Sequence, residues 1–173
     1  IGPGHVSVVT GYQSYEALAE RYQVPIVISG FEPLDILQSI LMLVKQINAS
    51  TYKVGNQYTR AVNAKGNEKA QHLINHYFEL RAMFEWRGLG EMPDSALQIR
   101  SEYAAFDAEK QFTLSPSKGL DNKACECPAV LRGQKKPTEC KLFNNPCTPE
   151  NPLGSCMVSS EGACAAYFQY QHY

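Results

Sequence analysis

Residues 24–35, VPIVISGFEPLD, connect a compact apolar run to the start of a long amphipathic segment. The run 24–28 ends at Ser29-Gly30, which is the pattern of a buried parallel strand. Pro33 suits the first position of a helix, where its missing N–H costs nothing. Apolar residues then recur at helical spacing and predict an amphipathic helix to about Asn48. They are Leu34, Leu37, Ile40, Leu41, Val44 and Ile47.

The residues before this stretch repeat the same order of elements. Residues 6–9, VSVV, are a β-branched run that predicts a short strand. Residues 14–22 predict a helix with Ser14 as its N-cap. Strand, loop and helix in this order, twice, indicate βαβ units. The N-terminal part is therefore predicted to be an α/β domain with a partial parallel sheet.

The middle of the chain is predicted to contain both extended segments and a helix. Residues 52–54 and 58–62 are predicted to be extended, and Asn67 is predicted to cap a helix that runs through Leu80. Residues 83–90, MFEWRGLG, predict a strand that ends in a glycine turn.

The composition changes near Ser115. Six of the ten prolines lie between Pro116 and Pro152, which suppresses regular structure. The chain is therefore predicted to divide into an α/β domain, residues 1–114, which forms part of a larger domain, and a loop-rich domain, residues 115–173. A short C-terminal helix is predicted to begin at Ser159 or Ser160, with Glu161 in its first turn.

All six cysteines lie in the second of these domains, between Cys125 and Cys164. A loop-rich segment with little apolar periodicity needs a stabilising cross-link, and a bound metal would provide one. Structural zinc sites usually present a C-x(2–4)-C pair, and the sequence has only the tighter Cys125-x-Cys127. Widely spaced thiolates beside prolines are more typical of an iron–sulfur cluster. Structural disulfides, a zinc domain and unligated buried cysteines are the alternatives.

Six thiols exceed the four ligands that a cubane cluster needs. Cys125 and Cys127 are too close in sequence for both to bind the same cluster without strain, so one of them is predicted to be spare. Cys156 is predicted to be the other spare thiol. Cys164 lies near the start of the C-terminal helix, where backbone amides stabilise a thiolate. The predicted metal ligands are Cys127, with Cys125 as its substitute, Cys140, Cys147 and Cys164.

Charge and hydropathy exclude two classes of partner. With a net charge of −1, the chain has no excess of basic residues with which to bind nucleic acid electrostatically. The sequence contains no run of 18 apolar residues, so no membrane-spanning segment is expected. The start, Gly2-Pro3-Gly4, lacks the Lys and Ser/Thr of a phosphate-binding loop.

Clustered cysteines in a chain with an ample apolar core indicate a reducing compartment, and a cytoplasmic location is expected.

Several motifs together resemble the HypD family of hydrogenase maturation proteins, over essentially the whole chain. The longest of them, in residues 157–167, has few chance matches. The motifs are GPGHVS in residues 2–7, GFEPLD in 30–35, EWRGLG in 85–90, CEC in 125–127, CTP in 147–149 and MVSSEGACAAY in 157–167.

The resemblance implies a [4Fe–4S] cluster and a role as an assembly scaffold with a redox step, rather than a free-standing enzyme. With the small partner HypC, such a protein carries the Fe(CN)2CO unit of [NiFe]-hydrogenase while it is built, and HypE delivers the cyanide groups. The cluster domain of the family is similar to the thiol–disulfide site of ferredoxin–thioredoxin reductase. There, one cysteine of a CxC pair can be a ligand while its neighbour is not.

The resemblance also implies that this chain corresponds to the C-terminal half of such a protein. The family's N-terminal half holds the cysteine that binds the iron under assembly, and residues 1–124 contain no cysteine. Binding of the Fe(CN)2CO iron is therefore expected only in the complete protein with its partner.

Four further side chains are candidates for the central cleft that the resemblance implies. His5 is either a group that holds or protonates the iron site or a hydrogen-bonded structural histidine. Glu32 and Asp35 stand at a helix start, where carboxylates favour the helix dipole, and capping is the favoured role. Glu161 has the same two interpretations. His72 and His76 share a helix face, but no Glu follows His72 as in the HExxH motif, so an exposed pair is favoured.

A rival function belongs to a different class. The same cysteines would suit a stand-alone thiol–disulfide oxidoreductase that uses the cluster and Cys125 or Cys127 on a protein disulfide. Binding to HypC separates this rival from the assembly scaffold, and visible absorption after anaerobic purification separates both from a zinc domain.

Overall fold

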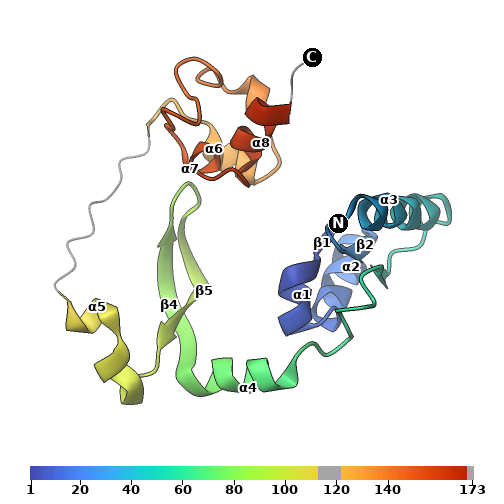
Figure 1. Cartoon of the computed structure of the whole chain (residues 1–173), viewed down its shortest axis with the longest axis horizontal. Coiled ribbons are helices and arrows are strands. Elements are labelled where there is room, and N and C mark those ends of the chain that lie inside the picture. Colours follow the sequence, from blue (N-terminus) through green and yellow to red (C-terminus); the bar gives the residue numbers. More distant parts are fainter. Residues whose placement is uncertain (113–121, 171–173) are drawn as a thin grey trace. The chain divides into compact units, whose positions relative to one another are not determined.

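The computed structural model describes residues 1–112 and 122–170. The chain forms two compact units, Ile1–Tyr77 and Phe78–Tyr173 (Figure 1). The fold is mixed α/β, with a parallel sheet in the first unit and an antiparallel hairpin in the second. The predicted domain boundary between residues 114 and 115 lies outside the described residues.

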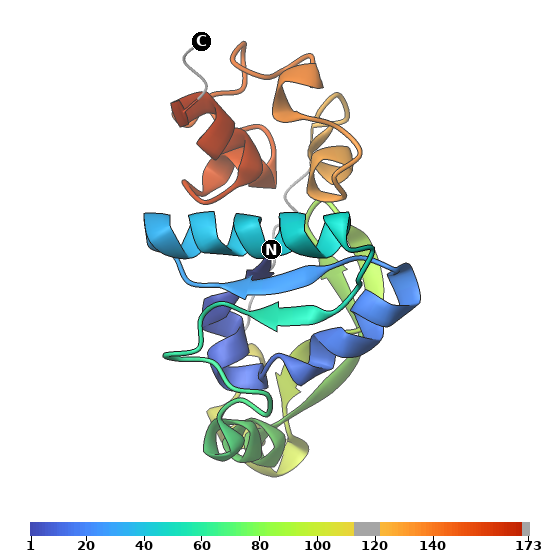
Figure 2. The same cartoon turned by 90° about the vertical axis from the view of Figure 1, so that its right-hand side faces the viewer.

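The first unit is built on a three-stranded parallel sheet. Its strands are β1 (Gly2–Pro3), β2 (Ile26–Ser29) and β3 (Val54–Asn56), in the order β1-β2-β3. Helix α3 (Pro33–Asn48) lies on one side of the sheet, and α1 (Gly4–Thr10) and α2 (Glu16–Tyr22) lie on the other (Figure 2). The predicted parallel strand and the helix from Pro33 to Asn48 are both confirmed.

Residues 6–9 were predicted to be a strand, and this prediction is wrong, because they belong to α1. The small residues Gly4 and Ser7 explain the difference. Ser7 is fully buried and its hydroxyl donates to the carbonyl of Pro3 at 2.8 Å. A side chain on Gly4 would collide with the carbonyl of Ser29. Close packing of a small-residue face against β2 thus overrides the β preference of three valines.

The other predicted boundaries of this unit shift by a few residues. A short 3₁₀ turn, Gln13–Tyr15, precedes α2, so Ser14 is not the N-cap. Residues 58–62 form a turn rather than a strand, with the N–H of Val62 bonded to the carbonyl of Tyr58. The side chain of Asn67 does accept from the N–H of Ala70 at the start of α4 (Glu68–Tyr77), which ends before the predicted Leu80.

The predicted apolar stripe of α3 is not buried. The helix turns Asp35 and Ser39 inward, whereas six apolar side chains on it are between 44% and 72% exposed. A continuous apolar surface of this kind favours association. The six residues, called the α3 stripe below, are Leu34, Leu37, Ile40, Leu41, Val44 and Ile47.

We expect the isolated 173-residue chain to self-associate through the α3 stripe. The double substitution Leu37→Gln and Leu41→Gln should shift the protein toward monomer in size-exclusion chromatography with light scattering, because it removes apolar surface without adding charge. Lys45→Gln, on an exposed position of the same helix, is the matched control and should leave the distribution unchanged. A wild-type chain that is already monomeric would contradict the expectation.

The second unit begins with a long hairpin. Strands β4 (Phe78–Trp86) and β5 (Gly90–Ile99) pair antiparallel from Phe78 opposite Ile99 to Trp86 opposite Gly90. The strand predicted in residues 83–90 and its glycine turn are confirmed, although β5 was not anticipated. A 3₁₀ segment, Ser101–Phe106, and α5 (Ala108–Gln111) follow the hairpin.

The cysteine-rich segment consists of short helices joined by loops. They are α6 (Cys127–Leu131), a 3₁₀ turn (Pro137–Glu139), α7 (Ser155–Val158) and α8 (Ala163–Tyr170). The predicted C-terminal helix begins at Ala163, so neither Ser159 nor Ser160 caps it and Glu161 precedes its first turn. The hydroxyl of Ser159 instead accepts from the N–H of Glu161 in the preceding turn. In the described part of the chain, no helix is long and apolar enough to cross a membrane.

Candidate metal centre

Cysteine side chains form the centre of the second unit. Its buried core contains four of them together with Val130, Met157 and Ala165, and Cys125 packs against this core. Cys140 is also buried, next to the 3₁₀ turn that precedes it. The structure therefore gathers in one unit all six cysteines that the sequence singled out. The buried ones are Cys127, Cys140, Cys147, Cys156 and Cys164.

The segment 153–156 surrounds two of the sulfur atoms with donors. The N–H of Leu153 donates to Sγ of Cys147 at 3.4 Å, and the N–H of Cys156 donates to Sγ of Cys127 at 3.3 Å. Ser155 Oγ shares a hydrogen bond of 3.1 Å with Sγ of Cys127. Hydrogen bonds of this type stabilise sulfur that carries negative charge.

Gly154 lets this segment approach the CxC pair. A Cβ atom at this position would collide with Sγ of Cys125 and would lie 3.1 Å from Cβ of Cys127. Only glycine leaves room for both sulfur-bearing side chains, so we call residues 153–156 the sulfur cradle. Sequence reasoning missed the cradle, because the sequence Leu-Gly-Ser-Cys carries no ligand signature apart from its cysteine.

The sulfur atoms of Cys156 and Cys164 lie 3.0 Å apart and share a hydrogen bond in which either sulfur can be the donor. Burial first, and then hydrogen bonds with Cys127 and Cys164, raise the pKa of the Cys156 thiol. Cys164 stands in the first turn of α8, as the sequence predicted.

Cys140 and Cys147 act electrostatically on the cysteines at both ends of the cysteine segment. Burial is the main cause that raises the pKa of Cys125 and of Cys164, and the sulfurs of Cys140 and Cys147 add to both shifts. A short loop sets the position of Cys147, whose N–H donates to the carbonyl of Leu142 at 2.9 Å.

The cysteine side chains have the donor chemistry of an iron–sulfur cluster. Within residues 1–112 and 122–170, no three His, Cys, Asp or Glu side chains are arranged to hold one metal ion. A four-iron cubane takes one thiolate at each iron, so its ligands surround it and do not converge on one point. Unpaired cysteines in a buried core with N–H donors on their sulfurs have the chemistry that such a cluster requires.

The cleft candidates of the first unit lie around the start of α3. The ring of His5 is 5.4 Å from that of Phe31, so the structure brings the GPGHVS and GFEPLD motifs together. Glu32 is exposed and forms a capping box with Asp35, which agrees with the capping role. The His72 and His76 rings are 6.3 Å apart on α4. Glu161 is exposed and belongs to the second unit.

Asp35 is a structural carboxylate. It is buried, and Arg60 donates to its two oxygens at 2.8 and 2.5 Å. Gln57 donates to it at 2.8 Å. The hydrogen bonds from Arg60, followed by those from Gln57, hold the pKa of Asp35 well below its usual range. Arg60 and Gln57 were missed because nothing in the local sequence pairs them with a residue some 25 positions earlier.

We expect Asp35→Asn to lower the urea midpoint of unfolding at pH 7, because it leaves the Arg60 guanidinium without its buried partner. The folded-state pKa of Asp35 is depressed, so its stabilising contribution is present above the unfolded-state value of about 3.9 and is lost as the pH falls below it. The difference between wild type and variant should therefore shrink below about pH 4. Exposed Glu32→Gln is the control, and an equal effect from it would contradict the assignment.

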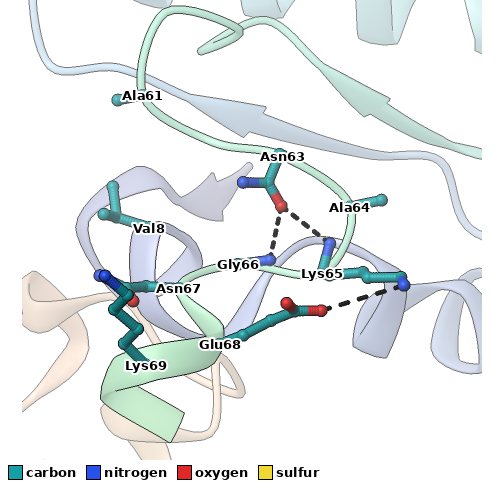
Figure 3. Close-up of a pocket in the computed structure, with 9 residues that line it drawn as sticks. All are labelled: Val8, Ala61, Asn63, Ala64, Lys65, Gly66, Asn67, Glu68 and Lys69. Atoms are coloured by element: carbon teal, nitrogen blue, oxygen red, sulfur yellow. Dashed lines mark hydrogen bonds and ion pairs between the residues drawn. The ribbon is translucent and has the colours of Figure 1, made fainter.

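A separate open groove of about 820 Å³ lies in the first unit, between α1 and the start of α4 (Figure 3). Asn63 Oδ1 accepts from the N–H groups of Lys65 and Gly66, and Lys65 forms an ion pair of 3.9 Å with Glu68. These contacts order the loop before α4. The groove contains none of the predicted site residues.

Comparison with known proteins gives a consistent result. A family model described as "HypD: Hydrogenase formation hypA family" matches residues 1–171. The chain is 62% identical to the hydrogenase expression/formation protein HupD of Azotobacter chroococcum over 170 residues, covering 98% of this chain and 45% of that protein. It is 61% identical to the hydrogenase maturation factor HypD of Azotobacter vinelandii, with the same coverage. With that of Rhodobacter capsulatus it shares 48% identity, over 98% of this chain and 46% of the relative. The chain thus spans about half the length of these relatives.

Proposed function

Because the chain belongs to the HypD family of hydrogenase formation proteins, we propose that it supplies the iron–sulfur half of a hydrogenase maturation factor. In this role it holds a [4Fe–4S] cluster and performs a thiol redox step, and it acts as a scaffold rather than as a free-standing enzyme. The single observation that carries the proposal is the clustering of six unpaired cysteines, five of them buried, in one small unit.

We assign Cys140, Cys147, Cys164 and Cys125 as the cluster ligands. The sulfurs of Cys140 and Cys147 act electrostatically on both Cys125 and Cys164, and we propose that these four sulfurs surround a common centre. We choose Cys125 over Cys127 because Cys127 lies against Cys156, the other cysteine that we leave unligated: the N–H of Cys156 donates to Sγ of Cys127.

Cys127 and Cys156 then remain as a thiol pair beside the cluster. Their closeness supports a thiol–disulfide step: the two thiols form a disulfide and pass two electrons and two protons to a disulfide of a partner protein, which becomes two thiols. The same pair serves the rival function, a stand-alone oxidoreductase, and this observation keeps that function as the second candidate.

The complete protein adds the assembly role. There, the chain is proposed to join HypC and to carry the Fe(CN)2CO iron, which HypE-type proteins supply with cyanide. His5 and Glu32, exposed near the start of α3, are the side chains proposed to face that iron. The iron here is cargo of the complete complex and not a resident group of this chain.

The proposal is tested by anaerobic reconstitution followed by metal analysis. The cluster requires about four irons and about four sulfides per chain, together with visible absorption. One zinc per chain without iron would contradict the proposal. A pull-down of the full-length protein with HypC separates the two functions, since an assembly scaffold binds HypC and a stand-alone oxidoreductase does not.

A further inference from the structure

The Cys127 sulfur is proposed above to exchange with a partner disulfide, yet Cys127 is only 3% exposed. On one side it is covered by the sulfur cradle, through Ser155 and the N–H of Cys156. These contacts belong to a buried core and are fixed by α6 and α7. Any route to the sulfur must therefore open from another side.

The turn of the β4–β5 hairpin, residues 87–89, covers that other side. Figure 1 shows the tip of the hairpin beside α6 and α7, within the second unit. A Cβ atom on Gly88 would lie 3.3 Å from Ser155 Oγ, 3.4 Å from Leu131 Cδ1 and 3.7 Å from Sγ of Cys127. The backbone of Gly88 therefore rests on the rim of the Cys127 site, and anything larger than a methyl group at this position would enter it.

One hydrogen bond between the turn and the cysteine segment comes from Arg132, whose Nη2 donates to the carbonyl of Leu89 at 3.4 Å in an exposed position. A long, solvent-exposed hydrogen bond contributes little to stability. The hairpin is held together by its own ladder between β4 and β5, and the buried core around the cysteines contains no hairpin residue. The turn can therefore lift without disturbing that core.

We propose that the turn 87–89 is a cap over Cys127, and that Gly88 is the residue whose missing side chain lets the cap close. The cap excludes small oxidants and unrelated thiols from the sulfur, and a partner disulfide reaches Cys127 when the turn lifts. This inference rests on the proposed redox role of Cys127 and adds a control of access to it.

Gly88 in the turn and Gly90 at the start of β5 provide a matched experiment. Gly88 and Gly90 have similar left-handed backbone conformations, with φ of +79° and +80°, which asparagine tolerates better than other residues. Nothing lies within 4 Å of a Cβ atom on Gly90. Gly88→Asn and Gly90→Asn thus impose the same backbone change, and only the first inserts a side chain between the cap and Cys127.

The measurement is the rate at which iodoacetamide alkylates Cys127 in the reconstituted chain, followed by peptide mass spectrometry. We expect Gly88→Asn to raise this rate at least tenfold and Gly90→Asn to leave it within about twofold of wild type. Arg132→Ala, which removes the hydrogen bond to Leu89 but no packing, should raise it by a smaller factor and serves if Gly88→Asn does not fold. Wild-type rates in both Gly88→Asn and Arg132→Ala, or an equal rise in Gly90→Asn, would overturn the cap.

Iron content of the same samples separates this result from a failure of the proposed function. Cys127 is not an assigned ligand, so Gly88→Asn should keep the full complement of iron. The alkylation rate alone decides the cap, and the iron content alone decides the ligand assignment.

Discussion

Alanine at Cys140 or Cys147 is expected to abolish cluster binding, whereas Cys156→Ala is expected to retain about four irons per chain. Cys140 and Cys147 are assigned as ligands, so the loss of either removes one corner of the ligand set. Cys156 is not an assigned ligand, so its loss removes a hydrogen bond with Cys164 but no iron ligand.

The same experiment distinguishes the two members of the CxC pair. Cys125→Ala should lose the cluster and Cys127→Ala should keep it, because we assign Cys127, which lies against Cys156, to the unligated thiol pair. All variants are reconstituted under identical anaerobic conditions, and iron and sulfide are determined against protein. Equal iron loss in Cys140→Ala, Cys147→Ala and Cys156→Ala would refute the assignment, and retention in Cys125→Ala with loss in Cys127→Ala would exchange the two roles.

Removal of the cluster is expected to unfold the cysteine segment and to leave the first unit folded. The core of this segment is small and consists largely of cysteine side chains, and its helices are only four to eight residues long. Helices of this length are not stable by themselves, so the proposed cluster would supply much of the folding energy. Sheet and helix packing in residues 1–77 involves no cysteine.

Limited proteolysis with and without an iron chelator measures this difference. After chelation, cleavage should appear throughout residues 122–170, while a fragment that contains residues 1–77 persists. The Cys156→Ala protein, loaded with its cluster, is the control and should resist the protease as the wild type does. Equal protection of the cysteine segment before and after chelation would show that its fold is independent of iron.

The sequence predicted those elements whose signals are local. The run 26–29 and the helix that begins at Pro33 follow from a β-branched stretch, a proline and an apolar repeat, and the structure places them as expected. Residues 6–9 were misread because their conformation is set by the fit of Gly4 and Ser7 against a distant strand. Local preference does not contain that information.

The candidate site likewise combines features that local sequence predicts with features that depend on distant contacts. Cysteine spacing indicated the cluster segment, because ligands are chemically distinctive residues. The partners that orient the cysteines were not foreseeable, since Ser155 and Gly88 are common residues whose importance lies in the atoms they meet. Arg60, which holds Asp35 from 25 residues away, was missed for the same reason. Chemical identity is visible in a sequence, whereas proximity in space is not.

The sulfur cradle constrains the length of its segment more than most of its sequence. Leu153 and Cys156 contact sulfur through their backbone N–H groups, which every residue except proline possesses. Many side chains are therefore compatible with these two contacts, while Gly154 allows none because of Cys125. The contacts therefore depend on the number of residues in the segment. We expect selection to remove insertions and deletions within 153–156 more strictly than most substitutions. The length of this loop, rather than its exact sequence, is what its contacts with sulfur require.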